Sequence, residues 1–352
     1  MKTIDYVDCD RWDDGTAAGD CHAIVLAAGR GRRLEGFTGE REGQPIPKQF
    51  ARFGRRRSLL QRTLQRIEQL ALVSRTHVVV DATQVRMAQR QFHESDRMHL
   101  VVQPANRGTA AGVMLPLSCV MRENPDSTVL MTPSDHAIED DGLYRRGIFK
   151  AFSAIASDGK GIVLFGVRAG EPRTDYGWIV PGRALGGGLR EVDRFVEKPS
   201  PAQARQLYSE GGLWSTMVVA ARARDLWDLI CGAAPALGKV FAAANRMAEA
   251  SGERFRRHEY ESLPELDFSR DVLGAARHVA VLSWPSRMGW SDLGTPERLH
   301  EWLEQLGARS DGVAVQQGRA DRSPRPRDGV GSINATDERK EKSDAFDPAQ
   351  RR

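Results

Sequence analysis

Several features are missing from this 352-residue sequence. No apolar run approaches the roughly 20 residues needed to cross a bilayer. The polar, acidic segment 1–20 has no apolar stretch of the kind found in signal peptides. The four cysteines are far apart and lack metal-ligand spacing. These absences predict a cytoplasmic protein with reduced thiols and no membrane partner.

Strong charge of one sign is also missing, since the net charge is +4 and is spread along the chain. There is no basic stripe with interleaved aromatic residues and no recognisable nucleic-acid-binding module. A small basic surplus suits an enzyme of small polyanionic molecules at least as well as a nucleic-acid binder. We therefore expect no nucleic acid among the partners.

Apolar, β-branched runs alternate with amphipathic stretches, which predicts an α/β fold with a mainly parallel central sheet flanked by helices. In such sheets ligands bind beyond the carboxyl ends of the strands. Ser58 precedes a helical stretch with apolar residues on one face and is placed as its N-cap. The predicted strands are 77–81, 128–132, 162–167, 192–196, 217–220 and 279–284. The predicted helices are 58–70, 110–121, 201–208 and 223–230.

The composition changes towards the C-terminus, where from about Gly307 polar residues, glycine and proline dominate. We expect a polar extension over 1–20, one catalytic domain over 21–306 and a disordered tail over 307–352. The sequence contains no internal repeat, and in particular no hexapeptide periodicity of a β-helix.

The most informative segment is 24–50, in which the apolar run I-V-L leads into A-A-G-R-G-R-R-L, with P-K-Q-F 12 residues further on. Glycines let a backbone approach an anion closely, and successive N–H groups form a positive nest. The segment matches neither common Gly-rich fingerprint, because Gly-Lys-Ser/Thr is absent and Leu34 stands where the dinucleotide motif needs its third glycine. Alone it favours equally a phosphate loop and an ordinary connection with solvated arginines.

Four further segments are dense in groups that bind ligands. The run Q-P-A-N-R-G-T-A at 103–110 could read the edge of a nucleobase, or could be only a well-capped loop before a helix. Asp135 and Asp292 each follow a predicted strand, where two carboxylates suit Mg²⁺ and single ones more often cap turns. The F-V-E-K-P segment at 195–199 could hold a sugar phosphate or form a surface ion pair. The D-Y-G-W segment at 175–178 is predicted as a turn that a sugar could approach.

In this order the segments resemble the sugar-phosphate nucleotidyltransferases, and most closely the mannose-1-phosphate guanylyltransferases. The resemblance runs from about residue 23 to about 303 and rests on LAAGRGRRL, PKQF, QPANRGTA, PSDH, DYGWI, FVEKP, LWSTMVV and GWSDLGT. It implies a Rossmann-like fold and Mg²⁺-dependent transfer of a nucleotidyl group from a nucleoside triphosphate to a sugar 1-phosphate. The implied partners are these two small molecules, and a homo-oligomer stays open.

The resemblance also implies roles for individual residues. The implied nucleotide-binding residues are Leu26, Ala27, Ala28, Gly29, Arg30, Gly31, Arg32, Gln103, Asn106, Gly108 and Thr109. The implied sugar-phosphate residues are Tyr176, Gly177, Glu197, Lys198 and Ser215. The implied catalytic residues are Arg33, Lys48, Asp135 and Lys198, with Asp135 and Asp292 holding Mg²⁺. No protein nucleophile is needed, because the attacking phosphate is already an anion, so catalysis is mainly positioning and charge stabilisation.

This sequence departs from the family pattern in three places. Arg32 stands where the family usually has threonine, and Ser215 stands where it usually has asparagine. The chain also ends in a polar tail, from which we expect no isomerase activity of the kind found in bifunctional relatives. Three alternatives stay open: a cytidylyltransferase acting on methylerythritol phosphate, a thymidylyl- or uridylyltransferase acting on glucose 1-phosphate, and a nucleotide-binding regulator that has lost turnover.

Overall fold

The computed structural model describes residues 21–41, 44–53, 57–70, 73, 75–92, 98–158, 161–251 and 257–305. All of them belong to one compact unit, Met1–Val313, and the second unit, Ala314–Arg352, lies outside the described residues. The expected extension over 1–20 and the expected tail over 307–352 also lie outside them, and the domain boundaries stay predictions.

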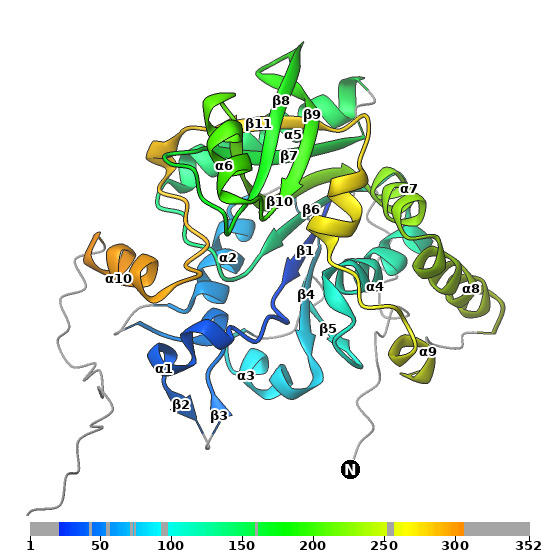
Figure 1. The fold of residues 1–352 in the computed structure, drawn as a ribbon. Helices are drawn as coiled ribbons and strands as arrows, with labels where there is room; N and C mark the ends of the chain where they lie inside the picture. The colour runs from blue at the N-terminus through cyan, green and yellow to red at the C-terminus, as the bar shows by residue number, and fades with distance from the viewer. Residues whose placement is uncertain are drawn as a thin grey trace, which may run out of the picture. The chain divides into compact units, whose positions relative to one another are not determined.

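Nine strands form the central sheet, in the order β5-β4-β1-β6-β10-β7-β11-β9-β8 (Figure 1). Their bounds are β1 (Cys21–Leu26), β4 (Arg75–Asp81), β5 (Met98–Gln103), β6 (Thr128–Pro133), β7 (Ile162–Arg168), β8 (Gly177–Gly186), β9 (Leu189–Glu197), β10 (Leu213–Arg222) and β11 (Ala280–Trp284). Two short strands, β2 (Glu40–Arg41) and β3 (Gln44–Pro45), form a separate hairpin. All six predicted strands are confirmed, with ends that differ by a few residues.

The N-terminal half of the sheet is parallel. Strand β1 pairs in parallel with β4 on one side and with β6 on the other, and β5 follows β4. From β1 the chain adds β4 and β5 on one side of the sheet and then returns to add β6 on the other side. The carboxyl ends of β1 and β6 therefore flank a topological switch point. Leu26 and Pro133 end these strands opposite each other. The arginine-rich loop and the loop that carries Asp135 thus start from the same edge of the sheet.

The C-terminal half is mixed and closes on itself. Strand β10 runs antiparallel to β6 and β7, and β11 is parallel to β7 and antiparallel to β9. Strand β8 pairs with both β9 and β10, so β10, β7, β11, β9 and β8 form a closed ring. The prediction of a turn over 175–178 is wrong for Gly177 and Trp178, which begin β8. They pair with Glu197 and Trp214.

Helices cover both faces of the parallel half. Helix α2 begins after Ser58, whose hydroxyl accepts from the backbone of Gln61 while the Gln61 side chain accepts from Ser58 N–H, so the predicted N-cap is confirmed. The α-helices are α1 (Glu35–Thr38), α2 (Leu59–Glu68), α3 (Val85–Gln89), α4 (Gly108–Glu123), α5 (Asp141–Asp158), α6 (Pro201–Ser209), α7 (Ala223–Ala233), α8 (Pro235–Ser251), α9 (Arg257–Glu261) and α10 (Pro296–Gln305). Single turns are η2 (Arg32–Leu34), η3 (Lys48–Phe50), η4 (Ala82–Gln84), the π-helical η5 (Phe268–Val272), η6 (Leu273–Ala275) and η7 (Ser286–Met288).

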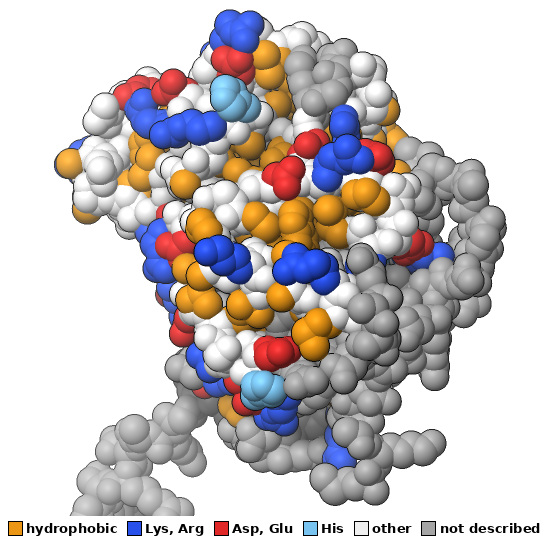
Figure 2. All heavy atoms as spheres, turned by 90° about the vertical axis from the view of Figure 1, so that its right-hand side faces the viewer, with side chains coloured by type: hydrophobic (Ala, Val, Ile, Leu, Met, Phe, Trp, Pro, Cys, Tyr) orange, Lys and Arg blue, Asp and Glu red, His pale blue; other side chains and the backbone are white. Residues whose placement is uncertain are grey.

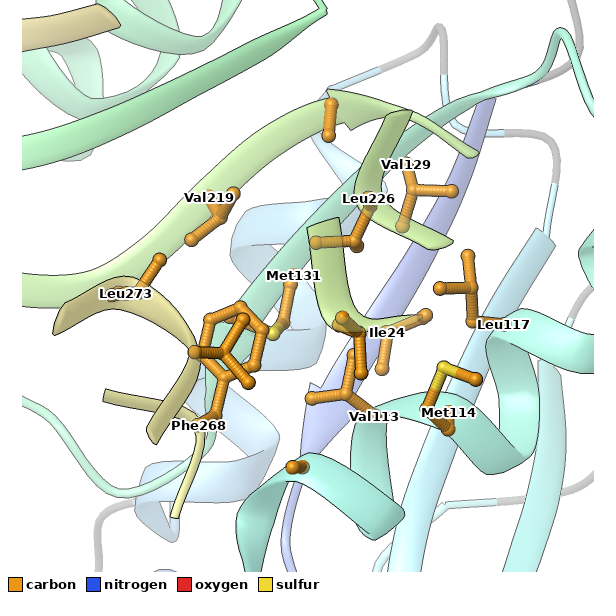
Figure 3. Packing of buried hydrophobic residues seen from close by; sticks show 14 of the residues in the cluster. Ile24, Val113, Met114, Leu117, Val129, Met131, Val219, Leu226, Phe268 and Leu273 are labelled. Atoms are coloured by element: carbon orange, nitrogen blue, oxygen red, sulfur yellow. The ribbon is translucent and has the colours of Figure 1, made fainter. Parts of the chain in front are cut away.

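The core has one layer on each face of the sheet. On one face, Leu60, Leu64 and Ile67 of α2 pack against Val25 and Val78. On the other face α4, α7 and the segment 268–273 close over β1, β6 and β10. Figure 3 shows Phe268 and Leu273 facing Met131 and Val219 across this layer. These contacts fix the sheet edge from which the candidate site residues project.

Three general expectations can be checked on the described residues. No helix among them is long and apolar enough to cross a membrane. The expectation of reduced thiols holds for Cys21 and Cys231, which form no disulfide, but not for Cys119, which is disulfide-bonded. On the described part of the face in Figure 2, basic, acidic and hydrophobic side chains are intermixed.

Candidate active site

Two buried glutamines orient the loop that follows β1. Nε2 of Gln49 donates to the carbonyl oxygens of Ala27 and Gly29, both at 2.7 Å, and Nε2 of Gln84 donates to Gly29 O at 3.0 Å. Because a trans peptide places its N–H opposite its carbonyl, the N–H that follows each of these carbonyls points away from the glutamines. The loop therefore turns its donors outward, which is the geometry of an anion nest.

The rest of this loop supplies cations. Gly31 has φ +63°, and a Cβ there would lie 3.1 Å from the backbone nitrogen of Lys48, so glycine permits a close approach of the P-K-Q-F segment. Arg33 is exposed in η2, and Arg30 is half-exposed with Nη2 3.9 Å from Asp81 Oδ2. Arg32 also lies in η2, but its side chain is not among those described.

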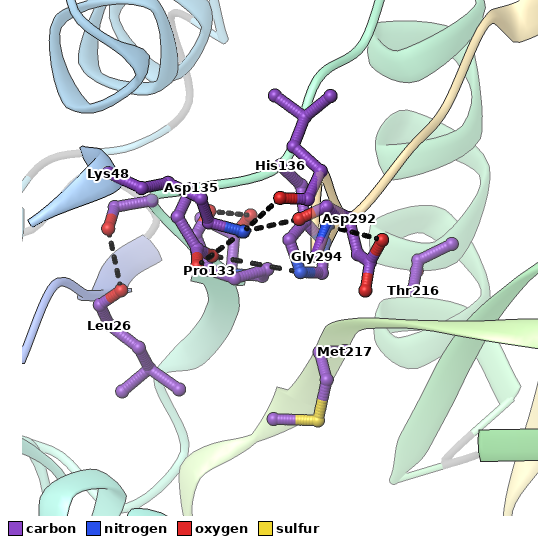
Figure 4. A network of polar contacts seen from close by, with 12 residues as sticks. Leu26, Lys48, Pro133, Asp135, His136, Thr216, Met217, Asp292 and Gly294 are labelled. Carbon is purple, nitrogen blue, oxygen red and sulfur yellow. Dashed lines mark hydrogen bonds and ion pairs between the residues drawn. The ribbon is translucent and has the colours of Figure 1, made fainter. Parts of the chain in front are cut away.

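The buried Lys48 ammonium links three segments of the chain (Figure 4). Its Nζ lies 3.1 Å from Asp135 Oδ2 and donates to the carbonyl oxygens of Asp292 and, at 3.3 Å, of Leu293. An ammonium has three donors, so all three are used in this arrangement. The sequence predicts Lys48 as a cation at the departing phosphates. The structure places it where it joins the Asp135 loop to the Asp292 segment.

Lys48, Asp135, His136 and Asp292 form a cluster, the Lys48 cluster, in which the pKa values of two side chains are shifted. Burial opposes ionisation of Asp135, but the charges of Lys48 and His136 and the hydrogen bond from Lys48 outweigh it and lower the pKa of its carboxyl. Burial also lowers the pKa of His136, although Asp135, with Oδ1 3.7 Å from His136 Nε2, acts in the opposite direction. At neutral pH the cluster therefore contains an ionised carboxylate beside a neutral imidazole.

Asp292 is held by Tyr176, which precedes β8, and by two residues that follow Asp292 in the chain. Its Oδ1 accepts from the Tyr176 hydroxyl at 3.2 Å and from Gly294 N–H at 3.0 Å, and lies 3.3 Å from Arg298 Nε. The buried Arg298 also pairs with Asp175 Oδ2 at 2.8 Å, and its guanidinium carbon lies 4.8 Å from the Tyr176 ring centroid. The described residues form no hydrogen bond to Asp292 Oδ2, although the carboxylate as a whole is ion-paired with Arg298. One carboxylate oxygen is thus left for a ligand.

The predicted sugar-phosphate residues come together where β8, β9 and β10 meet. A Cβ on Gly177 would lie 2.6 Å from Glu197 Oε2 and 3.4 Å from the Ser215 Cβ, so the glycine leaves a small space between them. Burial raises the pKa of Glu197, while Lys198, whose Nζ lies 3.3 Å from Oε1, acts against the rise. The Lys198 side chain is 57% exposed, so its ammonium can reach a ligand.

Backbone strain is concentrated around this site. Four described residues other than glycine have positive φ, and three of them, Lys198 (46°), Met217 (58°) and Leu293 (48°), lie beside the residues above. Met217 is in an irregularity of β10 between Ser215 and Val219, where its N–H faces the Ser215 hydroxyl at 3.4 Å. Such strain costs about 1–3 kcal/mol per residue and occurs mostly at functional sites.

The predicted base-binding segment is partly engaged by the protein itself. Gln103 ends β5 in a buried position, where its Oε1 accepts from the Tyr260 hydroxyl at 3.1 Å. A Cβ on Gly108 would overlap the Leu266 backbone, and the Thr109 hydroxyl accepts from Phe268 N–H at 2.7 Å. Asn106 is exposed, and its Oδ1 accepts from Gly108 N–H at 3.0 Å. Gly108 and Thr109 therefore have structural contacts that sequence reasoning did not identify.

Sequence reasoning missed three residues that shape the site: Gln49, Gln84 and Arg298. Gln49 lies within the P-K-Q-F motif, which could have indicated it, although nothing there points to the loop carbonyls. Gln84 and Arg298 belong to ordinary helical stretches and carry no local signal. The predicted metal ligands stay a prediction, since no group of three or more His, Cys, Asp or Glu side chains suited to a metal ion occurs among the described residues.

A loop of outward N–H groups beside the Lys48 cluster, at the switch point of an α/β sheet, is typical of nucleotide-binding folds. Residues 22–309 match the nucleotidyl transferase family, and the chain belongs to that family.

Individual relatives agree with this assignment. The chain is 26% identical over 279 residues to the mannose-1-phosphate guanylyltransferase RfbM of Salmonella typhimurium, covering 77% of this chain and 56% of the relative. It is 30% identical over 287 residues to the mannose-1-phosphate guanylyltransferase of Sinorhizobium fredii, covering 80% and 54%. The chain thus spans little more than half the length of these curated relatives.

A solved structure titled mannose-1-phosphate geranyltransferase, from Thermus thermophilus, is similar in fold. Its TM-score is 0.67 at 28% identity, and the similarity covers 78% of this chain and 76% of that one. The predicted α/β fold, Rossmann-like with a mixed central sheet, is confirmed.

Proposed function

We propose that the protein transfers a nucleotidyl group from a nucleoside triphosphate to a sugar 1-phosphate. The proposed substrates are GTP and mannose 1-phosphate. The observation that carries this proposal is the anion nest after β1, held open by Gln49 and Gln84 beside the Lys48 cluster. The names of the two guanylyltransferase relatives support the choice of base and sugar.

The reaction needs no covalent intermediate. An oxygen of the sugar 1-phosphate attacks the α-phosphorus in line. A phosphorus–oxygen bond forms there, and the bond to the bridging oxygen of pyrophosphate breaks, so that pyrophosphate leaves with that electron pair. Outward N–H groups of the nest bind the triphosphate, and the exposed Arg33 stabilises the negative charge that develops on pyrophosphate. Positioning and charge stabilisation supply most of the rate enhancement.

The residues present fit Mg²⁺, which prefers oxygen ligands and is bound through one or two carboxylates plus substrate phosphates. Asp135 and Asp292 would hold the ion, and the described residues form no hydrogen bond to Asp292 Oδ2. When bound, Mg²⁺ supplies positive charge at the phosphates. In this arrangement Lys48 acts as a positioning residue, because its ammonium holds the two aspartate segments together.

The sugar 1-phosphate would lie between β8, β9 and β10. The Glu197 carboxylate accepts hydrogen bonds from sugar hydroxyls, and the exposed Lys198 ammonium meets the phosphate. The missing side chain at Gly177 lets Glu197 lie close to β8 beside Ser215, where a sugar can contact it. Lys198 can contribute both to binding and to lowering the charge of the attacking phosphate.

A substrate grid tests the proposal. GTP, dTTP, UTP and CTP are each incubated with mannose 1-phosphate, glucose 1-phosphate and methylerythritol phosphate in the presence of Mg²⁺, and pyrophosphate release is followed. We expect turnover with GTP and mannose 1-phosphate, loss of turnover in Asp135→Asn, and normal turnover in the exposed control Asp193→Asn. Nucleotide binding without turnover on any pair would overturn the proposal and favour a regulator.

The proposal includes a cytoplasmic location, where nucleoside triphosphates are available, and small-molecule partners in place of nucleic acid. The intermixed charges on the face in Figure 2 support the second point. Cell fractionation tests the location, and sedimentation of the purified protein distinguishes a monomer from a homo-oligomer.

A further inference from the structure

A cavity of about 540 Å³ lies at one end of the closed ring of strands. Each of the five strands contributes to its wall: β7 through Arg168, β8 through Pro181, β9 through Arg190, β10 through Leu213 and β11 through Val281. Ligand pockets commonly have volumes of about 300–1,000 Å³. The cavity is therefore built into the fold and has room for a small organic molecule.

Three exposed arginines surround this cavity: Arg168, Arg190 and Arg287. Within the described parts of the chain, no carboxylate forms an ion pair with any of them. By contrast, Arg183 and Arg194, which lie on the β8–β9 hairpin together with Arg190, each pair with a glutamate. Three unneutralised guanidinium groups around one cavity create a positive potential that favours an anion. Guanidinium groups also match the geometry of phosphate oxygens.

Part of the cavity lining is apolar, because Leu213, Val281 and Trp284 all line it and are buried. Ser283 and Ser286 add neutral hydrogen-bonding side chains to the lining. A ligand that fits both kinds of lining has an anionic end for the arginines and a ring or other weakly polar body for the apolar side chains.

We propose that this cavity is a second binding site, for a phosphorylated small molecule of the size of a sugar phosphate or nucleotide. None of its lining residues belongs to the nest after β1, to the Lys48 cluster or to the sugar subsite. Ser286 and Arg287 belong to η7, six and five residues before Asp292, and Leu213 lies two residues before Ser215. The site is thus separate from the catalytic residues but built on the same strands.

Tungstate, a doubly charged tetrahedral oxyanion like phosphate, is a suitable probe because its anomalous scattering locates it. Crystals of the full chain are soaked in millimolar tungstate for three proteins: wild type, the Arg168→Gln/Arg287→Gln variant, and the control Arg183→Gln/Arg194→Gln. We expect a peak beside Arg168 and Arg287 in wild type and control, and none in the pocket variant. Tungstate bound at the nest after β1 gives a separate peak in all three proteins and does not affect the comparison of the peaks in the cavity.

Titration calorimetry with tungstate provides the second measurement. Losing two charge-assisted hydrogen bonds weakens binding at one site by about tenfold or more in the pocket variant, and leaves the control unchanged. The proposal is overturned if wild type shows no peak in the cavity, if the peak persists in the pocket variant, or if binding occurs at crystal concentrations only.

Discussion

Replacing Arg298 by methionine tests whether the buried guanidinium holds the site together. Its side chain is 6% exposed and faces Asp175 Oδ2 at 2.8 Å and Asp292 Oδ1 at 3.3 Å. Removing one partner of a fully buried ion pair costs about 3–5 kcal/mol. Here the two carboxylates keep 31% and 22% of their exposure, so water recovers part of the loss. We therefore expect Arg298→Met to lower the free energy of unfolding by about 2–3 kcal/mol.

Urea denaturation followed by tryptophan fluorescence measures this change. The matched control is Arg224→Met, because that arginine pairs with Asp126 at the surface with 45% exposure, and such pairs are worth about 0–1 kcal/mol. If the cost arises from unpaired carboxylates, Asp175→Asn added to Arg298→Met recovers part of the stability. Equal losses in Arg298→Met and Arg224→Met would refute the reasoning.

Three further changes have defined outcomes. In Lys48→Met the pKa of Asp135 rises, because burial, which raises it, is no longer opposed by the charge and the hydrogen bond of Lys48, so the acid limb of the pH profile of pyrophosphate release moves to higher pH. Gly177→Ala pushes a Cβ against Glu197, so it costs about 1–3 kcal/mol in urea denaturation and raises the KM for the sugar 1-phosphate. Burial holds the pKa of His77 well below its ordinary value, so below about pH 6.5 the unfolded chain binds the extra proton and stability falls as pH falls, by about 1.4 kcal/mol per unit. His77→Leu removes the part of the slope that His77 contributes, while His136, whose pKa burial also lowers, keeps its own part.

Each of these changes has a control. Lys48→Arg keeps the cation and should keep the acid limb near its wild-type position. Gly170→Ala places its Cβ in ordinary contact, 3.7 Å from Trp214, and should be tolerated. His258→Leu alters an exposed histidine and should leave the pH slope of stability as in wild type. An unshifted acid limb in Lys48→Met, full stability in Gly177→Ala, or an unchanged slope in His77→Leu would contradict the respective argument.

Local sequence patterns predicted the elements that carry the site. The apolar run before the arginine-rich loop is β1, and the residues around Ser58 form the cap that their spacing predicts. These features depend on neighbours a few positions apart, which a sequence shows directly. The sequence predicts a turn where the strand starts at Gly177, because a glycine beside aromatic residues has no clear strand periodicity and the partner strands come later in the chain.

The partners of the site residues could not be predicted, because they come from distant positions. Lys48 contacts Asp292, 244 residues away, and its three donors satisfy protein groups that no local pattern connects to it. Gln84 reaches Gly29 from a separate helical turn. Arg298 reads in the sequence as one more charged residue of a surface helix. Which polar residue becomes buried is decided by packing, and packing joins segments that the sequence separates.

Strand β10 has a consequence for the cooperativity of the whole sheet. It forms backbone ladders with β6 in the parallel half and with β7 and β8 in the closed ring. If the ring opened alone, β10 would either leave β6 with a bare edge or remain behind as an unfilled edge itself, and bare edges are prone to aggregation. The two halves should therefore unfold in one step, and amide hydrogens of β10 should exchange only at the rate of global unfolding. A chain cut between α5 and β7 would not yield two independently folding pieces.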